Sequence, residues 1–154
     1  MSQTPRRAEL RPTATGATSS PVLDQAILTE LRDLGATEFI HLVEMFLEDG
    51  AVIIQDLLNA RRVGRTTEIA GFAHSLKGGA GVFGAVGLVG QCAELETRFL
   101  ECDFIEQQRI IDGVTAKFHS ASEALRCELA LEQGLPRKGD VFQGTEDSAD
   151  AGVA

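Results

Sequence analysis

The chain has 154 residues, of which 44% are hydrophobic, and its formal net charge is −9. This length allows one domain with a buried core, and the negative charge would repel a phosphate backbone, which excludes nucleic acid as a partner. Three widely spaced cysteines indicate neither a disulfide framework nor a zinc site, and no apolar run approaches the roughly 18 residues of a membrane span. We therefore expect a cytoplasmic protein with no membrane, metal or cofactor requirement.

The ends of the chain differ in composition from its middle. Residues 1–20 are polar and aperiodic, and residues 133–154 are rich in Gly and Asp with one isolated Phe142. Both are predicted to be disordered tails. The domain is predicted at residues 21–132, where the apolar spacing is helical and no strand pattern occurs.

Five helices are predicted in this domain, in chain order at about 21–34, 36–59, 66–83, 85–101 and 103–131. Ser20 as N-cap and Pro21 at the first helical position open the first helix, and an Asp103-x-x-Glu106 capping pair opens the last. In the second helix Gly50 is a candidate bend. Short loops between long helices indicate antiparallel neighbours, so the fold class is all-α: an up-down four-helix bundle with an additional N-terminal covering helix.

Three arginines, Arg61, Arg62 and Arg65, are predicted to form a basic loop after the second helix. A solvated loop is the simpler interpretation. The alternative is a weak docking contact, since the loop precedes the third helix.

The third predicted helix carries an unusual run of glycines directly after His74-Ser75-Leu76-Lys77. Each glycine inside a helix costs roughly 1 kcal/mol relative to alanine, which favours a use for the bare surface. His74, Lys77 and Gly78 share one stripe because their spacings are i, i+3 and i, i+4. His74 lies off the centre of the apolar arc and is predicted to face solvent.

These three residue types suit transfer of a phosphoryl group. A neutral imidazole offers a nitrogen lone pair as the nucleophile. An ammonium one turn away compensates the added negative charge. In-line transfer requires close approach of a partner's carboxylate, and the absence of a side chain at Gly78 leaves room for it.

The segment Ala73-His74-Ser75-Leu76-Lys77-Gly78, with small residues up to Gly84-Ala85 and then Cys92 and Leu95-Glu96, resembles the histidine phosphotransfer (Hpt) domain of bacterial two-component phosphorelays. The resemblance extends from about residue 23 to 129, and its specific part is H-x-x-K-G. It implies a helical bundle whose exposed histidine relays a phosphoryl group between receiver-domain aspartates through a phosphohistidine intermediate. The chain would have no kinase activity of its own.

The resemblance also implies roles for individual residues. His74 would be the phospho-acceptor, Lys77 its charge partner and Gly78 the clearance residue. Gly81 and Gly84 match the family's spacing. Glu96 is placed where a polar side chain of the neighbouring helix supports the ring in some relatives, so it would either orient the imidazole or stay in solvent.

The implied partners are response regulator receiver domains and a hybrid histidine kinase, bound through apolar residues beside the histidine on the third and fourth helices. We expect a monomer that binds one receiver at a time. The alternative function is a non-phosphorylated helical adaptor that binds or sequesters a receiver domain or another regulator with the same face.

Two other motifs carry less weight. A metal site built from His41, Glu44, His74 and His119 is disfavoured, because Glu44 follows its histidine and no second pair exists. Residues 79–84 spell G-x-G-x-x-G, the dinucleotide fingerprint, but they follow a predicted helix, whereas the true motif follows a strand.

Overall fold

The computed structural model describes residues 21–134, and all regular structure in them is helical. In chain order the elements are α1 (Gln25–Asp33), α2 (Ala36–Val63), α3 (Thr66–Val82), α4 (Val86–Arg98), the 3-10 turn η1 (Phe99–Glu101) and α5 (Phe104–Glu132). The predictions made for residues 1–20 and 135–154, which include the Ser20 cap and the isolated Phe142, lie outside the described residues.

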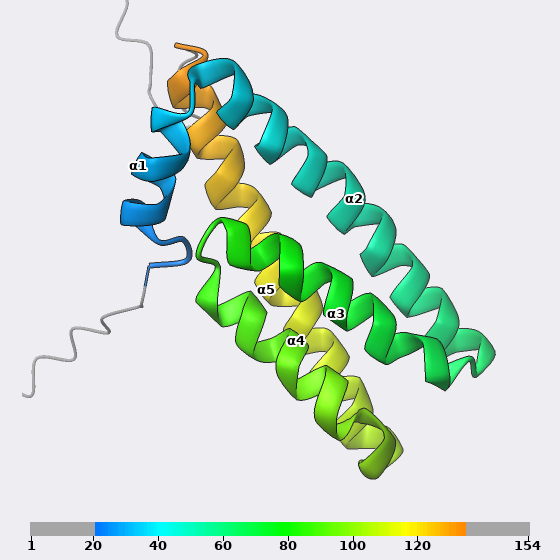
Figure 1. Cartoon of the computed structure of the whole chain (residues 1–154). Coiled ribbons are helices and arrows are strands. Elements are labelled where there is room, and N and C mark those ends of the chain that lie inside the picture. Colours follow the sequence, from blue (N-terminus) through cyan, green and yellow to red (C-terminus); the bar gives the residue numbers. More distant parts are fainter. Residues whose placement is uncertain (1–20, 135–154) are drawn as a thin grey trace, which may run out of the picture.

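Helices α2 to α5 form a bundle in which each packs against two others, α2 and α4 both lying between α3 and α5 (Figure 1). The short α1 packs against α2 at one end of this bundle. The predicted all-α fold, a four-helix bundle with an extra N-terminal helix, is therefore confirmed.

One apolar core joins the helices, and each contributes the stripe that its sequence spacing predicts. Its large members that are almost completely buried include Leu28 of α1, Phe39 and Leu57 of α2, Ile69 and Leu76 of α3, Leu88 and Leu95 of α4, and Ile110, Ile111 and Leu125 of α5. No helix among residues 21–134 is long and apolar enough to cross a membrane.

The start of α1 differs from the prediction. The N-cap is Asp24, whose carboxylate accepts hydrogen bonds from the backbone N–H groups of Ala26 and Ile27, so Pro21 lies before the helix. The turn between α3 and α4 holds this cap in place, because Phe83 C=O accepts a hydrogen bond from the Asp24 N–H.

Gly84 makes that contact sterically feasible. Its φ is +62°, in the left-handed region, and a Cβ there would lie 2.3 Å from Asp24 Cβ. The glycine predicted to end the histidine helix thus also lets α1 lie against the bundle.

The end of α2 is also later than predicted. The helix continues to Val63 and terminates at Gly64, which has φ +78° and closes the last turn with its N–H. Arg61 and Arg62 therefore belong to the last helical turn, and the prediction that they form a loop was wrong. Gly50 lies against α5, since a Cβ there would be 2.4 Å from Phe118 Cε2. At the start of α5, Asp103 accepts the Glu106 N–H as predicted.

Candidate functional site

His74 lies in the middle of α3 with its side chain 75% exposed. The residues that anchor the helix on either side of it, Ala73 and Leu76, are buried. The imidazole therefore projects from the bundle surface on a helix whose opposite face is fixed in the core, as the sequence pattern predicts.

Glu96 of α4 connects the histidine and the lysine. Its Oε1 lies 2.7 Å from His74 Nδ1, and its Oε2 accepts a charge-assisted hydrogen bond from Lys77 Nζ. The Glu96 side chain is only 17% exposed. Of the two alternatives left open for this residue, orienting the imidazole or staying in solvent, the geometry matches the first.

The protonation of the pair follows from the same contacts. The hydrogen bond from Lys77 lowers the pKa of the Glu96 carboxyl, and the one to His74 lowers it further, while burial opposes both. An ionised carboxylate only accepts hydrogen bonds, so His74 Nδ1 must carry the hydrogen and donate it. In the neutral ring the lone pair then lies on Nε2.

The glycines of this region divide into two groups. At Gly78 and Gly81 an added Cβ would meet no heavy atom within 4 Å, and both positions are exposed. Gly79 is different, because a Cβ there would lie 3.0 Å from Phe46 Cδ2 of α2. The first two leave the surface next to His74 bare, whereas Gly79 allows α2 and α3 to pack closely.

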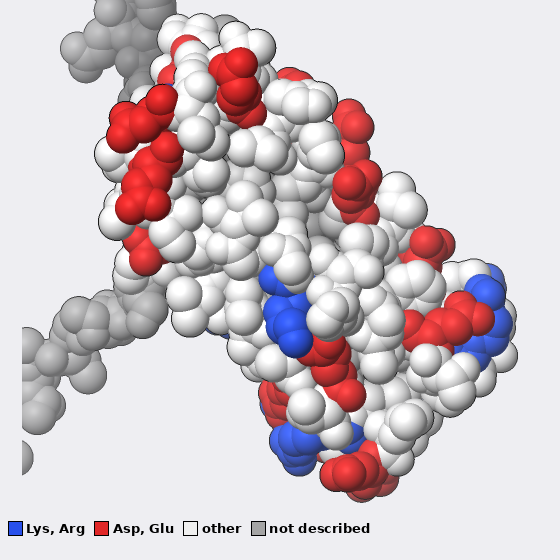
Figure 2. All heavy atoms as spheres, in the orientation of Figure 1, with Lys and Arg blue, Asp and Glu red and all other residues white. Residues whose placement is uncertain are grey.

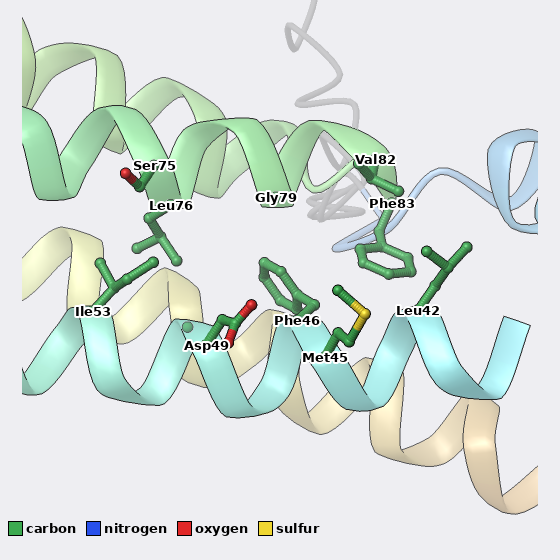
Figure 3. A pocket seen from close by; sticks show the side chains of 11 residues that line it. Leu42, Met45, Phe46, Asp49, Ile53, Ser75, Leu76, Gly79, Val82 and Phe83 are labelled. Atoms are coloured by element: carbon green, nitrogen blue, oxygen red, sulfur yellow. The ribbon is translucent and has the colours of Figure 1, made fainter. Parts of the chain in front are cut away.

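A groove of about 320 Å³ runs between α2 and α3 beside this surface. Figure 3 shows Met45, Phe46 and Asp49 extending from α2 toward the side of α3 that carries Ser75 and Gly79. Asp49 is the charged residue of the lining and Ser75 is polar; the rest are apolar residues or glycine. The groove on α2 was not predicted from the sequence, and the expectation of docking residues on the third and fourth helices stays a prediction. The spacing of Leu42, Met45, Asp49 and Ile53 was a signal for this groove.

Charge is unevenly distributed around the site. On the face shown in Figure 2, uncharged atoms cover much of α3, and acidic side chains follow the outer edge of α2 and the region of α1. Basic side chains appear near the middle of this face and at the end of the bundle away from α1.

The other residues considered from sequence do not join the site. Burial, with a smaller contribution from the Glu96 charge, raises the pKa of the Cys92 thiol to about 12, so the thiol stays protonated. His41 and His119 are exposed, and among residues 21–134 no three His, Cys, Asp or Glu side chains are grouped as a metal would require. The G-x-G-x-x-G stretch forms the end of α3 and the following turn, with no strand in the described part of the chain.

The described residues form an all-α bundle that presents an imidazole on an exposed helix face, where a partner protein can reach it. The sequence model of the Hpt domain matches residues 41–136. The chain thus belongs to the Hpt domain family and takes part in histidine phosphotransfer within phosphorelays.

A solved structure supports this assignment. The chain is similar to histidine-containing phosphotransfer protein B from Pseudomonas aeruginosa PAO1, with 27% sequence identity and a TM-score of 0.66 over 77% of this chain and 100% of that one. No curated protein sequence was found to match.

Proposed function

We propose that this chain relays a phosphoryl group between receiver-domain aspartates, with His74 as the phospho-acceptor. The observation that carries the proposal is the hydrogen bond of 2.7 Å between His74 Nδ1 and Glu96 on an otherwise exposed ring. This contact leaves Nε2 as the nitrogen that faces an approaching partner.

The proposed step is an in-line displacement at phosphorus. The Nε2 lone pair forms the P–N bond while the bond from phosphorus to the receiver's aspartate oxygen breaks, and the electron pair of that bond leaves on the aspartate carboxylate. The ring becomes positively charged as the bond forms. The hydrogen stays on Nδ1 and remains donated to Glu96, whose negative charge stabilises the charged ring. The reverse displacement passes the phosphoryl group to the next receiver.

Lys77 is proposed as the charge partner of the phosphoryl group. Before transfer its ammonium is paired with Glu96, which holds it one helical turn from His74. The incoming phosphoryl oxygens add negative charge next to this pair. The lysine stem is long enough to let the ammonium move from the carboxylate toward those oxygens.

The groove between α2 and α3 is proposed as the receiver docking surface. It borders the histidine through Ser75 and contains Asp49 among apolar side chains, so the matching surface of the receiver would be apolar and carry a cation. Asp49→Lys is expected to lower the rate of transfer at limiting receiver concentration at least about tenfold, a loss of ~1.4 kcal/mol. The matched control Glu44→Lys makes the same charge change on α2 outside the groove, and equal effects of the two variants would contradict this docking site.

The test of the function uses the purified chain and a receiver domain carrying labelled phosphate. Wild type should acquire label that is stable to alkali and labile in acid, as phosphohistidine is, and His74→Gln should acquire none while its circular dichroism is unchanged. Labelling of His74→Gln would refute the proposal. Receiver binding that persists in both proteins without label on either would favour the adaptor function. A hybrid histidine kinase is the proposed source of the phosphoryl group.

A further inference from the structure

A second groove, separate from the histidine surface, lies between the last turns of α2 and the first turns of α5. Its volume is about 340 Å³, and it is lined by Leu58, Arg61, Arg62, Phe104, Gln108 and Ile111. We call it the distal groove. It lies at the end of the bundle away from α1, where α2 ends and α5 begins (Figure 1).

Exposed large apolar side chains occur in the groove and in the chain next to it. Phe104 is 68% exposed and the adjacent Ile105 is 79% exposed, and Leu100 of η1 is 70% exposed. Large apolar side chains grouped in this way on a water-soluble surface are typical of a protein interaction site. None of them contributes to the core or to the His74 surface.

Within the described residues 21–134, the two arginines of the groove donate hydrogen bonds to the neutral groups Phe104 C=O and Asn59 Oδ1 and have no carboxylate partner. The ion pairs formed among residues 21–134 engage Arg32, Arg65, Lys77, Arg98 and Arg109, whereas Arg61 and Arg62 form none. The Arg61 guanidinium stacks 4.2 Å from the centroid of the Phe104 ring, and its Nε is buried without a hydrogen-bond partner. In a chain of net charge −9, this groove combines apolar walls with uncompensated positive charge.

The chain itself contains a segment of complementary chemistry. Residues 139–150 read Gly-Asp-Val-Phe-Gln-Gly-Thr-Glu-Asp-Ser-Ala-Asp and carry four acidic residues and no basic one around Val141-Phe142. An aromatic anchor next to carboxylates fits a groove that offers an aromatic ring and two guanidinium groups that form no ion pair within residues 21–134.

The length of α5 determines whether this segment can reach the distal groove of its own chain. Phe104 lies about 45 Å along the helix axis from Gly134, and even Ile111 lies about 34 Å away, at 1.5 Å per residue. The eight residues from Gly134 to Phe142 span at most about 28 Å when fully extended. Phe142 therefore cannot reach the distal groove of its own molecule.

We propose that residues 139–150 of one chain bind in the distal groove of a second copy, with Phe142 against Phe104 and the acidic residues on Arg61 and Arg62. Two copies lying antiparallel would exchange these segments reciprocally, which gives a closed dimer. The distal groove shares no lining residue with the groove beside His74, so this contact does not use that groove. The dimer replaces the monomer expected from the sequence.

The test measures the mass of the full-length, unphosphorylated chain by sedimentation over a wide concentration range. Wild type should rise from 16.5 kDa toward twice that mass. Phe142→Ala and Arg62→Glu should each shift the dissociation constant upward at least about tenfold. Arg126→Glu is the matched control, because it makes the same charge change at an exposed arginine of α5 outside the groove, and it should leave the dimer intact.

Mixing the two variants provides a sharper measurement. The Arg62→Glu chain retains an intact tail and the Phe142→Ala chain an intact groove, so one of the two contacts can form in the mixture, which should associate more than either variant alone. A synthetic peptide of residues 139–150 should bind Phe142→Ala chains and not Arg62→Glu chains. Wild type that stays at the mass of one chain at every concentration, or a dimer that Phe142→Ala does not weaken, would overturn the proposal.

Discussion

Substitutions of Gly78 should change the stability of the fold and the rate of phosphotransfer in opposite directions. The residue is in the interior of α3 and exposed, and a Cβ added there would meet no heavy atom within 4 Å. Gly78→Ala removes the conformational cost of glycine without a clash. It should therefore raise the free energy of unfolding by about 1 kcal/mol, which corresponds to a rise in melting temperature of about 3–6 °C for a domain of this size.

A larger side chain at the same position should lower the rate of phosphotransfer although it stabilises the fold. In Gly78→Gln the folded state should gain a similar or slightly smaller stability, but the side chain would stand one helical turn from His74 where a receiver must approach. We expect the rate of transfer from a labelled receiver to fall at least about tenfold, ~1.4 kcal/mol. Unfolding in urea followed by circular dichroism gives the first quantity, and loss of label from the receiver gives the second.

Gly90→Gln is the control. Gly90 is also exposed, in the interior of α4, and has the same open space around its Cβ position, so its substitution should stabilise the fold and leave transfer unchanged. A Gly78→Gln protein that transfers at the wild-type rate would refute the idea that this glycine serves access to the histidine.

Three further predictions concern the neighbours of the histidine and the turn that ends its helix. Lys77→Ala should slow phosphotransfer while the melting temperature changes little, because Lys77 is partly exposed and its ion pair with Glu96 lies outside the apolar core. An unchanged rate would show that the lysine is incidental. The pKa of Glu96 is lowered in the folded state, so its contribution to stability is present above the ordinary pKa of 4.5 and is lost as the pH falls below that value. Between about pH 7 and about pH 3, Glu96→Gln should therefore lose less unfolding free energy than wild type, as measured by urea unfolding. Gly84→Ala should lower the unfolding free energy by at least about 2 kcal/mol, since the residue has a positive φ and an added Cβ would collide with Asp24 Cβ. Gly81→Ala is the control and should raise the unfolding free energy, because an added Cβ there meets open space. Stabilisation by both substitutions would contradict this role of the turn.

Much of the fold follows from local sequence signals. The helical periodicity identifies each helix and its buried face, and Asp103 caps α5 as its spacing from Glu106 predicts. One boundary that was predicted wrongly, the start of α1, depends on a contact distant in sequence. Asp24 caps α1 and the turn at Gly84 packs on it, and sequence reasoning had no means to pair these two positions.

Part of the candidate site also follows from the sequence. The i, i+3 and i, i+4 spacing of His74, Lys77 and Gly78 places them on one stripe without knowledge of the fold. The groove next to them was missed because α2 carries two apolar stripes side by side, and periodicity alone does not distinguish the stripe in the core from the one around Asp49. That distinction requires the position of α3, which covers one stripe and leaves the other partly open.

The two faces of α3 have separate tasks, and this explains how the helix tolerates its glycines. Exposed glycines such as Gly78 and Gly81 each cost about 1 kcal/mol of helix stability, so α3 would be a poor helix in isolation. Ile69 and Leu76 are almost completely buried, and burial of such side chains contributes roughly 1.5–3 kcal/mol each. Because the inner face holds the helix in place, the outer face can remain bare, and the space next to His74 is kept open by a rigid element. A loop could offer equal access, but it would not hold the imidazole at a fixed distance from Glu96.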